Sequence, residues 1–183
     1  KRFADALTAR AQRGTRIFFT PGNRDFLLGA DYLSQFGGTR LEDEVCVQVA
    51  GSQALLMHGD TLCTDDTDYL KFRALVHSPH WQAEMLSKPL PERRELARQL
   101  RAMSKDAASN KAEDIMDVNA VAVAKLMSDH DVATIIHGHT HRPARHTLAA
   151  GERFVLGDWT DQRGWLLREN GGDLSLEHFS LSH

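Results

Sequence analysis

Val132-Ala133-Thr134-Ile135-Ile136-His137-Gly138-His139-Thr140-His141 is the stretch of sequence that decides the fold. Its apolar and β-branched start ends abruptly in glycine and histidine, which predicts a buried strand with polar residues at its carboxyl end. This edge is where open α/β sheets usually bind ligands. In an extended segment His139 and His141 would project to the same side, and Gly138 would let the backbone turn or approach an ion. An ordinary loop histidine is the alternative at each of the two positions.

Two earlier stretches repeat the pattern of a strand followed by a polar turn. Pro21-Gly22-Asn23-Arg24-Asp25 follows the strand-like residues 16–20, and His58-Gly59-Asp60 follows the apolar residues 54–57. Histidine, asparagine and carboxylate side chains suit a hard or borderline dication such as Mn²⁺. Two such ions, about 3.5–4 Å apart, can bridge a phosphoryl group and activate water. The three junctions therefore indicate phosphoryl chemistry, for which a diphosphate ester is a natural substrate.

The composition is that of an ordinary globular protein. Of the 183 residues, 42% are hydrophobic and 26% are charged, and the net charge of −3 gives no reason to expect a nucleic-acid partner. The length fits a single domain. Cys46 and Cys63 form no Cys-x-x-Cys pair, and the sequence contains neither a secretion signal nor a run of about 18 apolar residues. A reducing cytosol is therefore the simplest compartment, and we expect a monomer.

Hydrophobic periodicity and turn residues predict the local elements. Helices are expected over residues 1–13, 25–36, 69–77, 91–106 and 111–127. The 25–36 helix would place Asn23 and Arg24 near a helix N-terminus, which favours a bound phosphate. Residues 44–57 read as a hairpin with a turn at Gly51-Ser52. Short strands near residues 154–156, 165–168 and 174–179 predict a terminal antiparallel meander.

Residues 79–130 differ from the rest of the chain because prolines punctuate their start and they contain no β-rich run. We interpret this segment as a two-helix insertion that carries several arginines. In one interpretation its two apolar faces pack together and the arginines form a solvated surface. In the other, the basic, apolar-faced hairpin binds an acylated substrate drawn from an anionic membrane surface.

The order and spacing of these motifs resemble the calcineurin-like metallophosphoesterases. Within that superfamily, residues 22–29, 58–66 and 137–143 are similar to the branch that hydrolyses UDP-2,3-diacylglucosamine in lipid A biosynthesis, and the likeness covers essentially the whole chain. The resemblance implies an α/β fold, a four-layer αββα sandwich spanning residues 1–183 as one domain. It also implies that residues of about 79–130 form a helical-hairpin cap.

The resemblance implies a ligand set for two Mn²⁺ ions. Asn23, His58 and His139 would hold one ion and His141 the other, while His137 would pack or hydrogen-bond instead. His139 would also count among the catalytic residues. Arg24 presents a planar fork suited to a phosphate and to the charge that develops on it. A surface salt bridge with the neighbouring Asp25 is the alternative role for Arg24.

The resemblance also implies a set of substrate contacts. The expected substrate-binding residues are Asn23, Arg24, Asp66, Tyr69, Arg101, Ser104, Lys111 and His139. Ala108 departs from the pattern, because asparagine is often found at this position of the branch. Without the resemblance, each cap residue in this set would be interpreted as a solvated helix side chain.

The implied reaction is hydrolysis of the diphosphate bond of UDP-2,3-diacylglucosamine to UMP and 2,3-diacylglucosamine 1-phosphate (lipid X). The enzyme would work at the cytoplasmic face of the inner membrane of a Gram-negative bacterium, as a peripheral protein. Two alternatives stay open: a general metallophosphoesterase or nucleotide pyrophosphatase, and a non-catalytic scaffold with the same fold. A broad substrate screen would separate the enzymes.

The first residue is Lys1, and the chain opens in the middle of a helical pattern without a cap. The superfamily pattern begins with an Asp-x-His motif and a Gly-Asp motif, and neither precedes Asn23 here. We therefore expect an N-terminally truncated domain that lacks the bridging carboxylate. Alone, these 183 residues should bind metal weakly and turn over substrate poorly.

Overall fold

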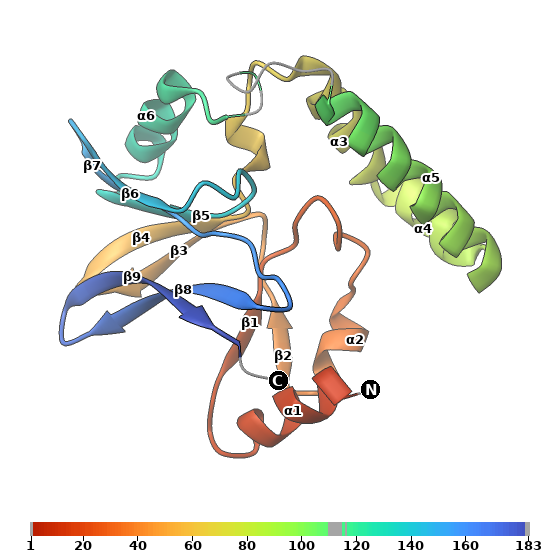
Figure 1. The fold of residues 1–183 in the computed structure, drawn as a ribbon, viewed down its shortest axis with the longest axis horizontal. Coiled ribbons are helices and arrows are strands. Elements are labelled where there is room, and N and C mark those ends of the chain that lie inside the picture. Colours follow the sequence, from red (N-terminus) through yellow and green to blue (C-terminus); the bar gives the residue numbers. More distant parts are fainter. Residues whose placement is uncertain (1, 110–114, 116, 182–183) are drawn as a thin grey trace. The chain divides into compact units, whose positions relative to one another are not determined.

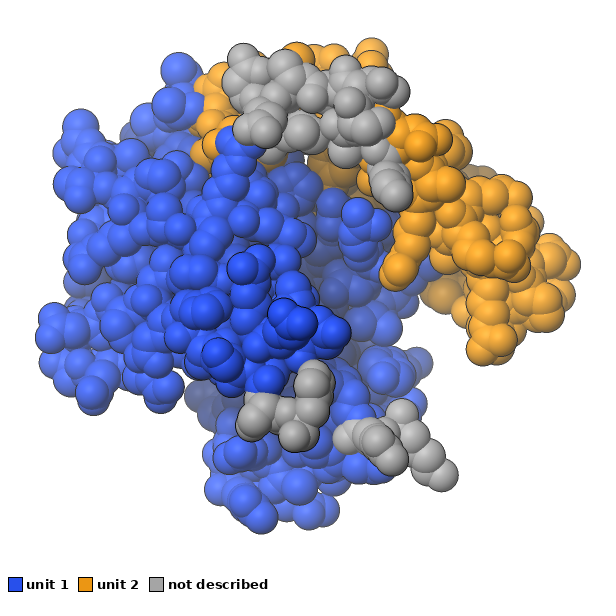
Figure 2. Space-filling view, in the orientation of Figure 1, with its two compact units in different colours: residues 1–60, 120–183 blue, residues 61–119 orange. Residues whose placement is uncertain are grey.

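The computed structural model describes residues 2–109, 115 and 117–181 (Figure 1). The chain divides into two compact units, which Figure 2 colours separately. Unit 1 comprises Lys1–Asp60 and Ala120–His183, and unit 2 comprises Thr61–Asn119. Together they contain the short helices and strands of a mixed α/β protein.

Unit 1 carries all of the described strands. Its elements in chain order are α1 (Arg2–Ala11), β1 (Ile17–Phe19), α2 (Ala30–Ser34), β2 (Gly38–Arg40), β3 (Glu44–Val49), β4 (Ser52–Met57), α6 (Ala120–Asp129), β5 (Thr134–His137), β6 (Ala144–Leu148), β7 (Gly151–Val155), β8 (Arg163–Asn170) and β9 (Asp173–Ser180).

A five-stranded mixed sheet in the order β3-β4-β5-β7-β6 forms the centre of unit 1. Its middle strands β4, β5 and β7 run parallel, whereas β3 and β6 are antiparallel edge strands. Ile136 is in register with Leu56 on one side and with Phe154 on the other. Apolar side chains of the central strands are buried on both faces of the sheet: Leu55, Ile135 and Phe154 are all 0% exposed.

The core on one face of this sheet is formed by Ala54, Ile136 and Phe154. Leu167 of β8 and Leu174 of β9 pack against these three residues. The β8–β9 hairpin therefore covers this face of the sheet, so that sheet packs on sheet.

On the β8–β9 hairpin, Arg168 and Glu177 form a two-pronged ion pair, with Nε to Oε1 at 2.8 Å and a second bond of 3.1 Å to Oε2. The hydrogen bonds from Arg168 and then Ser175 lower the pKa of the Glu177 carboxyl below its ordinary value. The pair lies on the surface, so it contributes little to the stability of the hairpin.

The hairpin predicted over residues 44–57 is confirmed as β3 and β4. Its turn residues are Ala50 and Gly51, with φ of 51° and 76°, one residue earlier than predicted. Two consecutive positive φ values are typical of the two-residue turn whose twist matches paired antiparallel strands.

Unit 2 is helical. It contains α3 (Thr67–Val76), α4 (Pro79–Ser87) and α5 (Leu90–Ser109). Asp66 is the N-cap of α3, and its carboxylate accepts the Tyr69 N–H at 3.1 Å. Ser78 is the N-cap of α4, and its hydroxyl accepts the Trp81 N–H at 3.3 Å. These side-chain caps, with Pro79 in the first turn, explain why two short helices begin where they do.

Two predicted helices differ from the structure. Residues 23–27 form turns, and the helix predicted over 25–36 shrinks to α2, so that no helix begins at Asn23. The second insertion helix, predicted from Lys111, is described as α6 of unit 1 from Ala120, and residues 115 and 117–119 before it are not helical. Residues 111–114 and 116 lie outside the described part of the chain. The helical cap predicted over about 79–130 stays a prediction.

The terminal meander is also wrong in part. The strand near Phe154 pairs in parallel with β5 and antiparallel with β6, and of the three predicted strands only those at β8 and β9 pair with each other, as an antiparallel hairpin. The cause lies at Gly151, with φ of 142°, where a Cβ would overlap the Ala133 carbonyl. The Glu152 N–H donates to that carbonyl at 2.8 Å, which fixes the start of β7 beside β5.

Phe154→Ala should destabilise the protein by about 3–5 kcal/mol, because it opens a cavity in the centre of the five-stranded sheet. Phe3→Ala is the matched control, since Phe3 is 69% exposed on α1 and its removal should cost less than about 0.5 kcal/mol. Urea denaturation measures both. Equal losses of unfolding free energy for the two variants would contradict this assignment of the core.

Candidate metal centre

The parallel pairing of β4 with β5 brings two of the sequence motifs to one edge of the sheet. His58 directly follows β4, and His139 follows β5 after Gly138. Because the two strands are parallel neighbours, their carboxyl ends meet at the same edge. The Gly138 N–H donates to the His58 carbonyl at 3.0 Å, which ties the two loops together beyond the strands.

The imidazoles of His58 and His139 face each other through their nitrogens. His58 Nε2 and His139 Nδ1 are 3.2 Å apart, and the rings meet at 72° with centroids separated by 5.1 Å. Two nitrogens at this separation suit neighbouring positions around one dication, because metal–nitrogen bonds are about 2.0–2.1 Å long. The donor pair therefore fits a bound metal ion.

The third motif reaches the same place. A Cβ on Gly22 would lie 2.8 Å from both Nδ1 and Cε1 of His58, so the backbone of this loop presses directly against the imidazole. The Gly22 N–H donates to Asp25 Oδ1 at 2.7 Å, which closes the turn around Asn23. Only a residue without a side chain fits at Gly22, and the half-buried Asn23 follows it immediately.

The loop after β5 is not extended as predicted. His139 and His141 both have left-handed backbones, with φ of 63° and 54°, whereas Gly138 does not. Left-handed histidines carry strain that non-glycine residues usually avoid, and such strain tends to gather at functional sites. The Oγ1 of Thr140, between them, is buried without a hydrogen-bond partner in the described part of the chain.

His141 is exposed, and no described contact joins it to His58 or His139. Within the described residues, no three His, Cys, Asp or Glu side chains are arranged to hold a metal ion. The structure therefore brings together two histidines and the loop of Asn23, while the assignment of His141 stays a prediction.

His137 is buried, at 1% exposure, and both of its ring nitrogens are engaged. Its Nδ1 lies 2.9 Å from the Gly138 carbonyl, and its Nε2 lies 3.1 Å from an Arg153 guanidinium nitrogen. Since the carbonyl accepts and the guanidinium donates, His137 carries its proton on Nδ1. This agrees with the expectation that His137 hydrogen-bonds rather than ligates.

Sequence reasoning missed Gly59 and Arg153, which fix His137. A Cβ on Gly59, with φ of 106°, would lie 2.6 Å from His137 Nδ1. The sequence signal for Gly59 is a glycine that stands between two polar residues after a strand. The sequence carries no such signal for Arg153, because the position of Arg153 depends on the pairing of β7 with β5.

Arg24 is exposed, and no ion pair with Asp25 occurs among the described residues. The Asp25 carboxylate accepts a backbone N–H from Gly22 instead. The Arg24 guanidinium therefore extends into solvent next to Asn23 in sequence, where it is available to an anion.

The predicted substrate contacts in the helices belong to unit 2. Asp66 caps α3, and Tyr69 is half-buried in the first turn of that helix. Arg101 and Ser104 are exposed on α5, three residues apart and so on one side of the helix. Lys111 lies outside the described residues. These assignments stay predictions.

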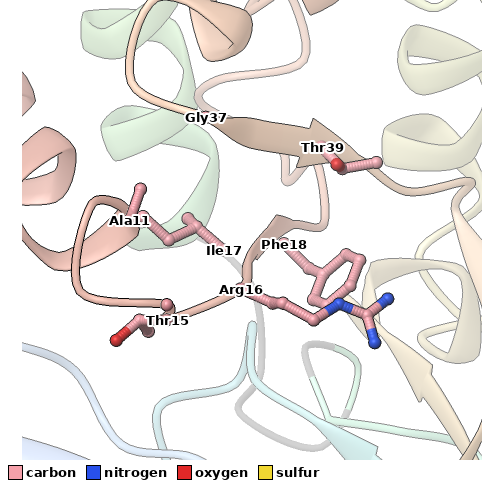
Figure 3. A pocket seen from close by; sticks show the side chains of 8 residues that line it. Ala11, Thr15, Arg16, Ile17, Phe18, Gly37 and Thr39 are labelled. Atoms are coloured by element: carbon pink, nitrogen blue, oxygen red, sulfur yellow. The ribbon is translucent and has the colours of Figure 1, made fainter.

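A separate cavity of about 420 Å³ lies between α1, β1 and β2 in unit 1 (Figure 3). The Arg16 guanidinium stands 4.9 Å from the centre of the Phe18 ring at its rim. None of the predicted site residues lines this cavity.

Residues 1–143 match the family of calcineurin-like phosphoesterases, and the chain belongs to that family. Membership implies a metal-dependent hydrolase. A solved archaeal phosphodiesterase is 10% identical, with a TM-score of 0.45, over 91% of this chain and 70% of its own.

Curated relatives of this chain within the family share one enzyme name. The UDP-2,3-diacylglucosamine hydrolase of Chromohalobacter salexigens is 45% identical over 182 residues, which cover 97% of this chain and 74% of that protein. Proteins of the same name from Cellvibrio japonicus and Escherichia coli K12 are 46% and 44% identical, and the matches cover 75% and 76% of their lengths. In the part of the chain that the structure describes, no helix is long and apolar enough to cross a membrane.

Gly22→Ala should weaken Mn²⁺ binding by about tenfold or more, because the new methyl group displaces the His58 ring. Gly29→Ala is the matched control, since no atom lies within 4 Å of a Cβ at that position and its φ is −85°. Isothermal titration calorimetry measures both affinities. Unchanged affinity in a folded Gly22→Ala variant would show that this contact does not position a ligand.

Proposed function

We propose that this chain hydrolyses the diphosphate bond of UDP-2,3-diacylglucosamine, releasing UMP and 2,3-diacylglucosamine 1-phosphate in lipid A biosynthesis. The observation that carries the proposal is the facing pair His58 and His139, with the Gly22-Asn23 loop pressed against it. Relatives named for this reaction are 44–46% identical over nearly the whole chain, which supports the choice of substrate.

In this proposal Asn23, His58 and His139 hold one Mn²⁺ ion, and His141 contributes to a second. The ions, when bound, polarise phosphoryl oxygens and lower the pKa of a water molecule. The chain itself positions the proposed metal ligands. The loops that follow β1, β4 and β5 meet at the pair of His58 and His139. The contacts of His137 with Gly138 and Arg153 hold the loop after β5.

Arg24 and His139 are the proposed catalytic residues. The Arg24 guanidinium can donate two parallel hydrogen bonds to a phosphate, and it can stabilise negative charge that grows on the phosphoryl oxygens during attack. Its exposure and its lack of an ion pair with Asp25 support this role. The phosphate is also contacted by Asn23, which is next to Arg24 in the sequence, and by His139.

Unit 2 supplies the proposed contacts to the rest of the substrate. Asp66, Tyr69, Arg101, Ser104 and Lys111 would bind the glucosamine phosphate or the acyl chains. Helix α5 supports this, because it exposes Leu90 and Met103, at 50% and 65%, on a segment that is rich in arginine. Apolar side chains beside cations suit acyl chains near an anionic surface. We further propose that the protein works as a monomer on the cytoplasmic face of the inner membrane.

We also propose that the fold is a four-layer αββα sandwich. The packing of the β8–β9 hairpin on the five-stranded sheet supports the two inner layers of a four-layer αββα sandwich. Helix α6, with Val123 and Met127 buried, would contribute to an outer layer.

Arg24→Ala should lower kcat for UMP release by about 10²-fold, because one donor to the developing charge is lost. The assay measures Mn²⁺-dependent UMP release from UDP-2,3-diacylglucosamine by the protein as the cell produces it. Arg10→Ala, at an exposed position of α1, is the matched control and should leave the rate unchanged.

Two outcomes would contradict the proposal. Release of UMP from many nucleotide diphosphates at equal rates would indicate a general pyrophosphatase. No release by the unmodified protein at saturating Mn²⁺ would indicate a non-catalytic scaffold.

A further inference from the structure

Three side chains that the proposed function does not use lie in line at the edge strand of the central sheet. Cys46 Sγ is 3.8 Å from His130 Nδ1, and His130 Nε2 is 3.2 Å from Glu44 Oε2. Glu44 and Cys46 belong to β3, and His130 directly follows α6. A thiol, an imidazole and a carboxylate in this order are the parts of an activated nucleophile.

The carboxylate decides which nitrogen of His130 carries the proton. Ionised Glu44 can only accept, so Nε2 donates to it and Nδ1 keeps its lone pair. That lone pair points at the sulfur of Cys46, which holds the proton that a base must remove. In the neutral ring, Nδ1 of His130 is therefore the nitrogen that can accept the thiol proton.

The backbone holds both partners in place. Helix α6 ends in two nested backbone hydrogen bonds. The Val132 N–H donates to Met127 O at 3.0 Å, and the Asp131 N–H donates to Ser128 O at 3.3 Å. Asp131 has a left-handed φ of 51°, which completes the Schellman motif. His130 is the cap residue of this motif. Glu44 and Cys46 are two residues apart on a strand and so share one face.

The two cysteines differ in access. Cys46 is exposed, whereas Cys63 is buried at 1% exposure. A reagent in solution can therefore reach the sulfur of Cys46, which is the cysteine that lies beside His130. The three side chains are not arranged to hold a metal ion, so their order suits thiol chemistry.

We propose that Cys46 is a modification site that undergoes thiol–disulfide exchange with low-molecular-weight disulfides, with His130 as base and Glu44 as its orienting partner. The Cys46 proton passes to His130 Nδ1, and the thiolate attacks one sulfur of the disulfide. A new sulfur–sulfur bond forms on Cys46 as the old one breaks, and the departing thiolate takes the proton from His130. Cys46 is oxidised and the departing sulfur is reduced, so the exchange balances.

A purely structural role for the same contacts gives the opposite expectation. If Glu44 and His130 only fastened the end of α6 to β3, removing His130 would leave Cys46 equally or more accessible. Its rate of modification would then stay the same or rise. A base gives a fall in rate, so the direction of the change separates the two roles.

The test follows the reaction of the protein as the cell produces it with 2,2′-dithiodipyridine at pH 7. Thiopyridone absorbance gives the rate constant, and peptide mass mapping identifies the modified cysteine. His130→Gln should slow modification of Cys46 by about tenfold, because an unassisted thiol is only a few per cent thiolate at this pH. Glu44→Gln should slow it about threefold, since the tautomer is no longer fixed.

The matched controls are Glu42→Gln, two residues before Glu44, and His80→Gln, on the exposed face of α4. Both should react as the unmodified protein does. An unchanged or faster rate in both folded variants, His130→Gln and Glu44→Gln, would overturn the proposal. So would modification of Cys63 at the rate of Cys46.

Discussion

The candidate site depends on the parallel pairing of β4 with β5. This pairing alone places His58 and His139, which are far apart in the sequence, at one edge of the sheet. The Gly138 N–H bond to the His58 carbonyl continues the pairing past the strand ends. Because Leu55 and Ile135 are fully buried, a register slip would expose the core, so the same burial that stabilises the sheet also fixes the histidine pair.

The loops around this pair have strained backbones and close packing, which hold the histidine rings in position. Gly22 and Gly59 lie so close to the rings of His58 and His137 that any side chain would collide. His139 and His141 hold left-handed backbones that glycine would adopt more easily. Such strain persists only where the surrounding contacts determine the structure. Here those contacts are the buried strands and the hydrogen bonds of His137, which explains how a loop can hold ligands in a fixed arrangement.

Local patterns predicted the strands before His58 and His139 and the 44–57 hairpin, because apolar runs and alternation are signals within a few residues. The 25–36 helix was wrong because the carboxylate of Asp25 bonds to the backbone of Gly22, which favours a turn over a helix. The contact of Gly22 with His58 and the partner of His137 could not be predicted, since both depend on pairing between distant strands. The ligand set and the cap contacts came from motif resemblance. The structure brings His58 and His139 together and sets Gly22 against His58, while the roles assigned to the site residues stay predictions.

The central claim is that the histidine pair and the asparagine loop hold a metal ion together. Anomalous diffraction from crystals soaked in Mn²⁺ tests it most directly, because the anomalous signal locates the ion without assumption about its ligands. We expect a peak bonded to His58 Nε2 and His139 Nδ1, with Asn23 beside it. A saturating soak that leaves this pair empty, or a peak bonded to other side chains, would contradict it.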